Sequence, residues 1–177
     1  MKSASSILGV LVFLLVAATL PAQADTFTTA CADVRTGPGT VTSGSYVSTQ
    51  GADDAVNEVM QETSSGGVSH LTHVWKFCNV PAGALSLVYE GTRATNSDGD
   101  NFQFYYNLTC DPGGDTGFQP ITGAIINHPF YPTGGLTSSM NITTTATVDI
   151  YLAIEDTAGG GNNDTVKIDY LAIKTVP

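Results

Sequence analysis

Two acidic loops carry the residue types best suited to metal chemistry. Residues 96–101 place Asp98 and Asp100 beside Ser, Asn and Gly, and residues 155–164 place Asp156 and Asp164 around a run of Gly and Asn. Ca²⁺ prefers about six to eight oxygen ligands from carboxylates and carbonyls, which such loops can supply. Neither loop has the spacing of an EF-hand. The two loops therefore predict a structural Ca²⁺ site, although Asp-Gly also favours a simple hairpin turn.

Strand direction decides whether these acids can act together. If consecutive strands alternate in direction, the loops after Glu62, Thr92 and Glu155 fall at one end of the protein. Carboxylates that converge there repel one another unless a cation lies among them. Glu62 and Asp169 are the further Ca²⁺ ligands that we predict. In the alternative interpretation Glu62, like Glu58 before it, faces solvent on an edge strand.

Three tyrosines are candidates for binding a ligand. Recognition of a glycan uses exposed aromatic rings beside hydrogen-bonding groups. Alternation along one strand puts Phe102 and Phe104 on the buried face and Tyr105 on the opposite face. We therefore predict that Tyr105, Tyr131 and Tyr151 bind an extracellular polysaccharide or another cell-surface component.

His73 and Trp75 could instead suggest a metal or a sugar-stacking site. They share one strand face with Leu71 and Phe77, so packing in the core is the better interpretation. The sequence has neither a Gly-x-Ser-x-Gly nor a His-Glu-x-x-His motif. We expect no catalytic residues and no enzymatic activity.

The elements that must position these residues are short strands. Turn residues separate the strand-like runs, and no segment shows a sustained helical period. Within the last run, alternation predicts that Val166, Ile168 and Tyr170 share one face, with Asp169 and Leu171 opposite. The pattern predicts an all-β protein, a single antiparallel β-sandwich of jelly-roll type with about eight or nine strands. The clearest runs are 55–62, 71–80, 85–92, 102–107, 147–155 and 165–174.

The N-terminus predicts export. Lys2, an apolar run over 7–20 and the Ala-Gln-Ala sequence at 22–24 are typical of a signal peptide at residues 1–24. Residues 25–177 then form one domain, and the protein is expected to be secreted by a bacterium. Sixteen acidic against six basic residues, a formal charge of -10, argue against nucleic acid. No later run is apolar enough to insert into a membrane.

Export also makes a disulfide expected among the three cysteines. Cys78 and Cys110 each end a strand-like run and could meet across a sheet, but Cys31 is also available. The sequence allows three pairings and does not choose between them.

Most of the chain from residue 44 to 175 resembles a β-sandwich accessory domain of secreted bacterial proteins. Such domains are appended to exoenzymes or found in adhesin-like proteins, and the resemblance implies a β-sandwich without an activity of its own. The closing strand, 166–171, looks like the end of jelly-roll carbohydrate-binding modules, which commonly hold a structural calcium. The matching segments are 44–46, 53–54, 62, 71–77, 96–104, 154–157 and 164–169.

Three functions remain from the sequence. The one we favour is a calcium-stabilised binding module that recognises an extracellular glycan or surface. The alternative is a structural subunit that assembles with copies of itself into a matrix, surface layer or filament, which the composition rich in Thr, Gly and Asn also allows. A secreted hydrolase is the third.

Overall fold

The protein is built almost entirely from antiparallel strands. Over the described residues the chain forms thirteen β-strands and one 3-10 helix, η1 (Tyr46–Thr49). The predicted all-β, antiparallel β-sandwich is confirmed, with more strands than the eight or nine expected. The predicted signal peptide falls almost wholly outside the described residues. The computed structural model describes residues 23–52, 56–94, 101–109, 117–129, 131, 135–158 and 160–177.

One layer is a six-stranded sheet centred on β13. Its strands lie in the order β11, β8, β13, β4, β3, and β1 pairs with the C-terminal half of β13. One edge of β13 has three pairing partners, which follow one another along the strand. They are β4, then Gln50 through a single bridge to Tyr170, and then β1. The strands are β1 (Thr26–Thr29), β3 (Thr40–Ser43), β4 (Glu58–Gln61), β8 (Gly83–Arg93), β11 (Leu136–Thr144) and β13 (Thr165–Val176).

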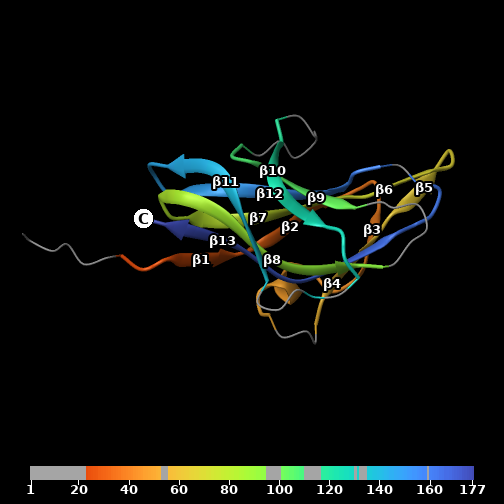
Figure 1. Ribbon diagram of the computed structural model, residues 1–177, viewed down its shortest axis with the longest axis horizontal. Coiled ribbons are helices and arrows are strands. Elements are labelled where there is room, and N and C mark those ends of the chain that lie inside the picture. The colour runs from red at the N-terminus through yellow and green to blue at the C-terminus, as the bar shows by residue number, and fades with distance from the viewer. Residues whose placement is uncertain are drawn as a thin grey trace, which may run out of the picture.

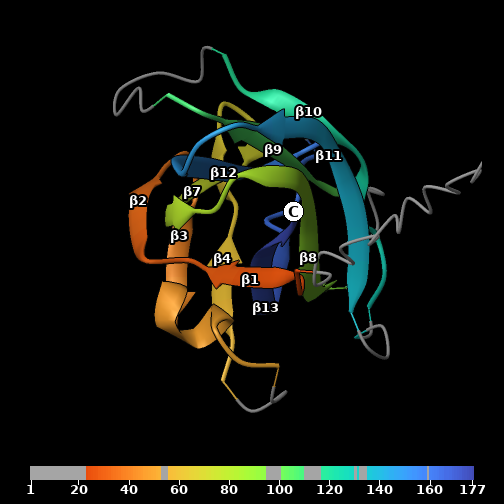
Figure 2. The same ribbon diagram turned by 90° about the vertical axis from the view of Figure 1, so that its left-hand side faces the viewer.

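The other layer is a five-stranded sheet in the order β10, β9, β12, β7, β2. It lies face to face with the six-stranded sheet, and the hairpin of β5 and β6 projects at one end (Figure 1). Seen along the strands, β7 and β12 lie above β1 and β13 (Figure 2). The bounds are β2 (Ala32–Thr36), β5 (Thr63–Ser65), β6 (Val68–His70), β7 (Thr72–Val80), β9 (Phe102–Asn107), β10 (Gln119–Ile126) and β12 (Val148–Asp156).

The core fills the space between the two sheets. Aromatic rings from both layers meet there. The ring centre of Phe104 of β9 lies 5.0 Å from that of Tyr89 of β8 and 6.4 Å from that of Trp75 of β7. His73 contacts Trp75 edge-on at 4.5 Å, and both side chains are fully buried, so the prediction that they pack in the core is confirmed. Burying each large apolar side chain stabilises the fold by about 1.5–3 kcal/mol.

A β-bulge in β13 overturns one prediction about the core. The register of β13 against β8 shifts between Ile168 and Tyr170, so alternation restarts there. Leu171 therefore joins Val166 and Ile168 in the core, whereas Tyr170 is only half-buried. The predicted grouping of Tyr170 with Val166 and Ile168 is wrong, because the extra residue of the bulge reverses the faces.

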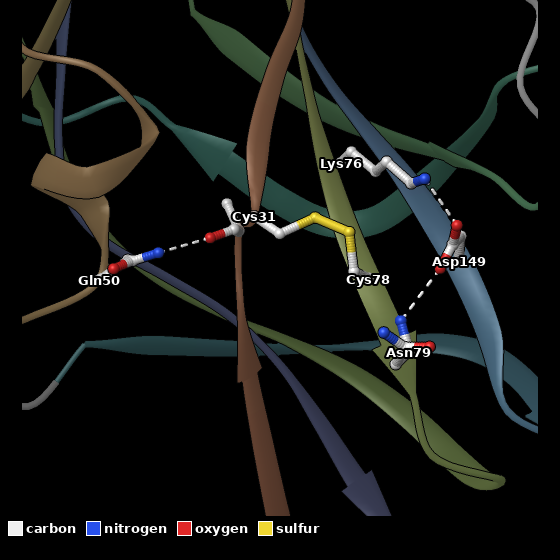
Figure 3. The surroundings of a disulfide bond; sticks show 7 residues. Cys31, Gln50, Lys76, Cys78, Asn79 and Asp149 are labelled. Atoms are coloured by element: carbon white, nitrogen blue, oxygen red, sulfur yellow. Dashed lines mark hydrogen bonds and ion pairs between the residues drawn. A yellow bond between two sulfur atoms is a disulfide. The ribbon is translucent and has the colours of Figure 1, made fainter.

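A disulfide holds the chain where it crosses between the sheets. Cys31 lies between β1 of one sheet and β2 of the other, and it is bonded to Cys78 of β7 (Figure 3). Nearby, Gln50 donates to the carbonyl of Ala30 at 2.7 Å. Of the three pairings that the sequence allows, the structure contains the one between Cys31 and Cys78. Cys110 lies outside the described residues.

The described residues contain no helix that is both long enough and apolar enough to cross a membrane.

Candidate functional site

Two of the three predicted tyrosines lie on one outward-facing surface. In β12, Tyr151 alternates with the buried Ile150 and Leu152, and in β9, Tyr105 follows the buried Phe104. The register aligns Tyr105 with Ala153, two residues along β12 from Tyr151. Such diagonal neighbours on adjacent strands have Cα atoms about 7–8 Å apart. Both rings can therefore contact one short ligand.

We call this surface the tyrosine face and define it as Tyr105, Tyr151, Lys76 and Glu155. Lys76 is aligned with Tyr151 from β7, and its Nζ lies 5.8 Å from the centre of the Tyr151 ring. Glu155 follows Tyr151 by four residues on β12, so its side chain projects on the same side of the sheet. Ala153 lies on the same face, between Tyr151 and Glu155 along β12 and opposite Tyr105. Its side chain is fully buried. The face thus combines two aromatic rings with one basic and one acidic group.

Charges around the tyrosine face are fixed by short contacts. Lys76 Nζ lies 2.7 Å from Asp149 Oδ2, and Asp149 Oδ1 accepts from the backbone N–H of Asn79 (Figure 3). The hydrogen bond to Asp149 raises the pKa of Lys76, and the same bond lowers the pKa of Asp149. Burial raises the pKa of Tyr105, and the negative charge of Glu155 adds to this effect. At neutral pH the face therefore offers a phenol donor, an ammonium donor and a carboxylate acceptor.

Tyr131 does not join this surface. Its hydroxyl is hydrogen-bonded to Asn57 Oδ1, next to the start of β4 in the six-stranded sheet. Tyr105 and Tyr151 lie on the outer side of the opposite sheet. The structure therefore brings together two of the three predicted ligand-binding tyrosines and leaves the third apart.

The described ends of the loops after Glu62, Thr92 and Glu155 meet at one end of the sandwich, as the alternation of strand directions predicts. The backbone of Glu62 donates to the carbonyl of Asp164 at 2.9 Å, Ala94 donates to Thr165, and Thr157 donates to Asn101. These bonds join the segments that follow β4, β8 and β12. The predicted convergence of the loops is confirmed.

The acids at this end already hold backbone groups. Glu62 Oε2 accepts from the backbone N–H of Asp164, and Asp156 Oδ1 accepts from Leu71. Asp156 Oδ2 also lies 3.3 Å from Nδ1 of His70. Glu62 is almost fully buried because β4 lies between β13 and β3, so the expectation that Glu58 and Glu62 face solvent on an edge strand is wrong.

The remaining predicted Ca²⁺ ligands are placed differently. Asp98 and Asp100 lie outside the described residues. Asp169 is fully buried in the bulge of β13, five residues beyond Asp164. At a strand rise of about 3.3 Å per residue, this separates the two by roughly 16 Å. Asp169 therefore lies within the strand, away from the loop that ends at Asp164.

A different cluster, which the sequence did not indicate, lies between the two sheets and reaches the surface at Asp33. His73 Nε2 is 3.2 Å from Glu58 Oε1 and 3.4 Å from Asp33 Oδ1. Over the described residues, this is the group of three His, Cys, Asp or Glu side chains whose potential ligand atoms all lie within 4.8 Å of one another. Asp33 and His73 come from β2 and β7 of the five-stranded sheet, and Glu58 comes from β4 of the other.

Neighbouring groups hold each member of this cluster in place. Thr36 Oγ1 lies 2.7 Å from Nδ1 of His73, and the indole N–H of Trp75 donates to Glu58 Oε2 at 2.7 Å. The backbone N–H of Tyr46 donates to both carboxylate oxygens of Asp33. Burial opposes the charged form of His73, but Asp33 and Glu58 outweigh it and raise the pKa of His73. Burial likewise works against the charged form of Asp33, yet His73 and the Tyr46 N–H lower its pKa.

Sequence reasoning missed this cluster because its members are far apart in the chain. The strand neighbours of His73 give no sign of the cluster, because Asp33 precedes His73 by forty residues and Glu58 precedes it by fifteen. The one local signal was a glutamate at the start of an apolar alternation, Glu58-Val59-Met60. Such a glutamate points inward when the alternation keeps Met60 buried.

Comparison with known proteins gives neighbours in fold only. No family model and no curated protein matches the chain. Among solved structures, it is similar to the carbohydrate-binding module TmCBM61, determined in complex with β-1,4-galactotriose, at 13% identity over 65% of this chain and 68% of that one, with a TM-score of 0.37. It is similar to infectious bursal disease virus, Gt strain, at 14% identity over 86% of this chain and 32% of that one, with a TM-score of 0.42.

A third similar structure is the enzymatically active domain of tailspike protein 4 from bacteriophage CBA120. The identity is 10% over 85% of this chain and 19% of that one, and the TM-score is 0.39. The chain thus spans about a third of the virus chain and a fifth of the tailspike chain. At this degree of similarity the likenesses concern the β-rich fold and carry no information on a ligand.

Proposed function

We propose that this protein is a secreted binding module that recognises an extracellular glycan through its tyrosine face. The observation that carries the proposal is the position of Tyr105 and Tyr151 on adjacent strands, facing outward on the same side of one sheet. A pyranose ring packs its C–H groups against aromatic rings, and its hydroxyls hydrogen-bond to charged and polar groups. Lys76 and Glu155 supply such groups beside the rings.

The module binds without cleaving its ligand. A glycosidase needs two carboxyl groups that flank the scissile bond. The tyrosine face as defined carries one, Glu155, and Asp149 beside it is held by Lys76 and Asn79. The outer face of a sheet suits an extended polysaccharide chain.

Replacement of either tyrosine tests the proposal. We expect Tyr105→Ala and Tyr151→Ala each to weaken retention on an insoluble polysaccharide about tenfold, equivalent to about 1.4 kcal/mol, because each removes one stacking ring. Depletion of the protein from solution by insoluble β-glucan, β-galactan, β-mannan, xylan and chitin would measure it, with release of reducing ends followed in the same samples.

The matched control is Phe27→Ala, which removes an exposed aromatic ring from β1 of the other sheet. It should bind like the unaltered protein. The proposal fails if the unaltered protein is retained by none of these polysaccharides, or if the two tyrosine variants are retained as well as Phe27→Ala.

We further propose that Ca²⁺ binds where the loops after β4, β8 and β12 meet and stabilises the module there. Glu62, Asp156 and Asp164 would contribute oxygen atoms after their carboxylates move together, since in the described part of the chain these three do not already form a group within 4.8 Å of one another. Bound Ca²⁺ would neutralise carboxylates that otherwise repel one another. The tyrosine face would then be supported by an ordered loop end.

Thermal melting of the chelator-treated protein tests this proposal. At a Ca²⁺ concentration one hundred times the dissociation constant, stabilisation is about 2.7 kcal/mol, or roughly 5–10 °C for a domain of this size. Asp156→Asn, which keeps an acceptor for the Leu71 N–H, should lose at least half of that shift. Asp149→Asn, at the other end of β12, should keep it. Equal melting temperatures with Ca²⁺, with Mg²⁺ and with neither would exclude the site.

A further inference from the structure

The cluster of Asp33, Glu58 and His73 has the spacing of ligands around a small metal ion. Zn²⁺ binds imidazole nitrogen and carboxylate oxygen at about 2.0–2.2 Å, and ligands at tetrahedral positions around such an ion are about 3.3–3.6 Å apart. Nε2 of His73 lies 3.2 Å from Glu58 Oε1 and 3.4 Å from Asp33 Oδ1. The separations of Nε2 from the two carboxylate oxygens are therefore close to those between ligands of a tetrahedral ion, and all three donor atoms lie within 4.8 Å of one another.

Two of these donor atoms have no hydrogen bond. Nε2 of His73 and Oε1 of Glu58 are buried, and neither makes a hydrogen bond of acceptable geometry, despite their short separation. Thr36 Oγ1 can accept the proton of Nδ1, so Nε2, which faces the carboxylate oxygens of Glu58 and Asp33, can hold either a proton or a metal ion. One of the two must lie there, because buried acceptors that face one another without a cation between them are unfavourable.

The hydrogen-bond partners of these three side chains match those that orient the ligands in known metal sites. In metal sites the second nitrogen of a histidine and the second oxygen of a carboxylate are usually hydrogen-bonded, which fixes their direction. Here Thr36 lies at Nδ1 of His73, and Trp75 holds the second oxygen of Glu58. The Tyr46 N–H fixes the carboxylate of Asp33. All three side chains are thus prepositioned.

We infer that Asp33, Glu58 and His73 form a binding site for a divalent first-row transition ion of the Zn²⁺ type. One imidazole and two carboxylates suit such an ion, whereas Ca²⁺ prefers oxygen ligands alone. The Asp33 side chain is one-third exposed, so the cluster can be reached from solvent on that side.

The ion joins the two layers of the sandwich. Asp33 and His73 belong to the five-stranded sheet, and Glu58 belongs to the six-stranded sheet, so one ion would bond to side chains of both sheets. The site lies on the inner side of β7, whereas Lys76 of the tyrosine face projects from its outer side. The inference is therefore independent of glycan binding.

Titration of the purified, EDTA-dialysed protein with ZnCl₂ tests the site, in a buffer that holds Ca²⁺ constant. Isothermal calorimetry should give one equivalent bound, and Co²⁺ in place of Zn²⁺ should give the intense visible absorption of a tetrahedral complex. Asp33→Asn should weaken Zn²⁺ at least tenfold, since it removes a charged ligand from a partly exposed position. Circular dichroism would show that this variant is folded.

His70→Gln is the matched control, because His70 is an exposed histidine next to an acid and could bind Zn²⁺ adventitiously. It should keep the full equivalent. Absence of stoichiometric binding in the unaltered protein overturns the inference, and the cluster is then an imidazolium held between two carboxylates. Loss of the equivalent in His70→Gln but not in Asp33→Asn overturns it as well.

Discussion

Replacing both Cys31 and Cys78 by serine is expected to lower the free energy of unfolding by about 4 kcal/mol. The bond closes a loop with a sequence separation of 47 residues, and removing it restores that loop's freedom to the unfolded chain. It also holds the crossover between the sheets, where Cys31 N–H donates to the carbonyl of Lys76 at 2.8 Å. Urea denaturation of the oxidised protein and of the double variant would measure the difference.

Cys110→Ser is the control for this prediction. The serine variant should unfold within about 0.5 kcal/mol of the unaltered protein, because Cys110 takes no part in the bond between the other two cysteines. A large loss of stability in Cys110→Ser, with little loss in the double variant, would mean that another pairing stabilises the protein in solution.

Features that depend on neighbouring residues in the chain could be predicted from the sequence. Alternation of residue types correctly placed Phe102 and Phe104 inside and Tyr105 outside, because each strand has one buried and one exposed face. Alternation of strand direction likewise brought the loops after β4, β8 and β12 together. Both rules need only strands that are regular and antiparallel.

Features that depend on irregularity or on distant contacts could not be predicted. The bulge at Asp169 moved Leu171 into the core, and nothing in the local sequence marks that extra residue. The disulfide partner of Cys78 lies across a crossover between sheets, which the sequence left open. The same holds for Asp33 and Glu58, which meet His73 only because strands from two sheets pack together.

Glu58 and His73 are fully buried, and this burial affects stability even without a metal ion. In EDTA, Glu58→Ala is expected to lower the free energy of unfolding by about 3–5 kcal/mol. The change removes the counter-charge of His73 and the acceptor of the Trp75 N–H, and it leaves a cavity at a fully buried position. Urea denaturation at constant pH would measure the loss.

Glu58→Gln separates the causes of that loss. The amide keeps the volume and an oxygen that can accept from Trp75, so we expect about half the loss or less. Gln61→Ala, a half-buried polar residue on the same strand, should cost no more than about 1 kcal/mol. If Glu58→Ala and Glu58→Gln are equally unstable, the negative charge beside His73 is what stabilises the junction of the sheets. If neither variant is less stable than the unaltered protein, the buried Glu58 carboxylate does not stabilise the fold. Its burial would then favour a role in metal binding.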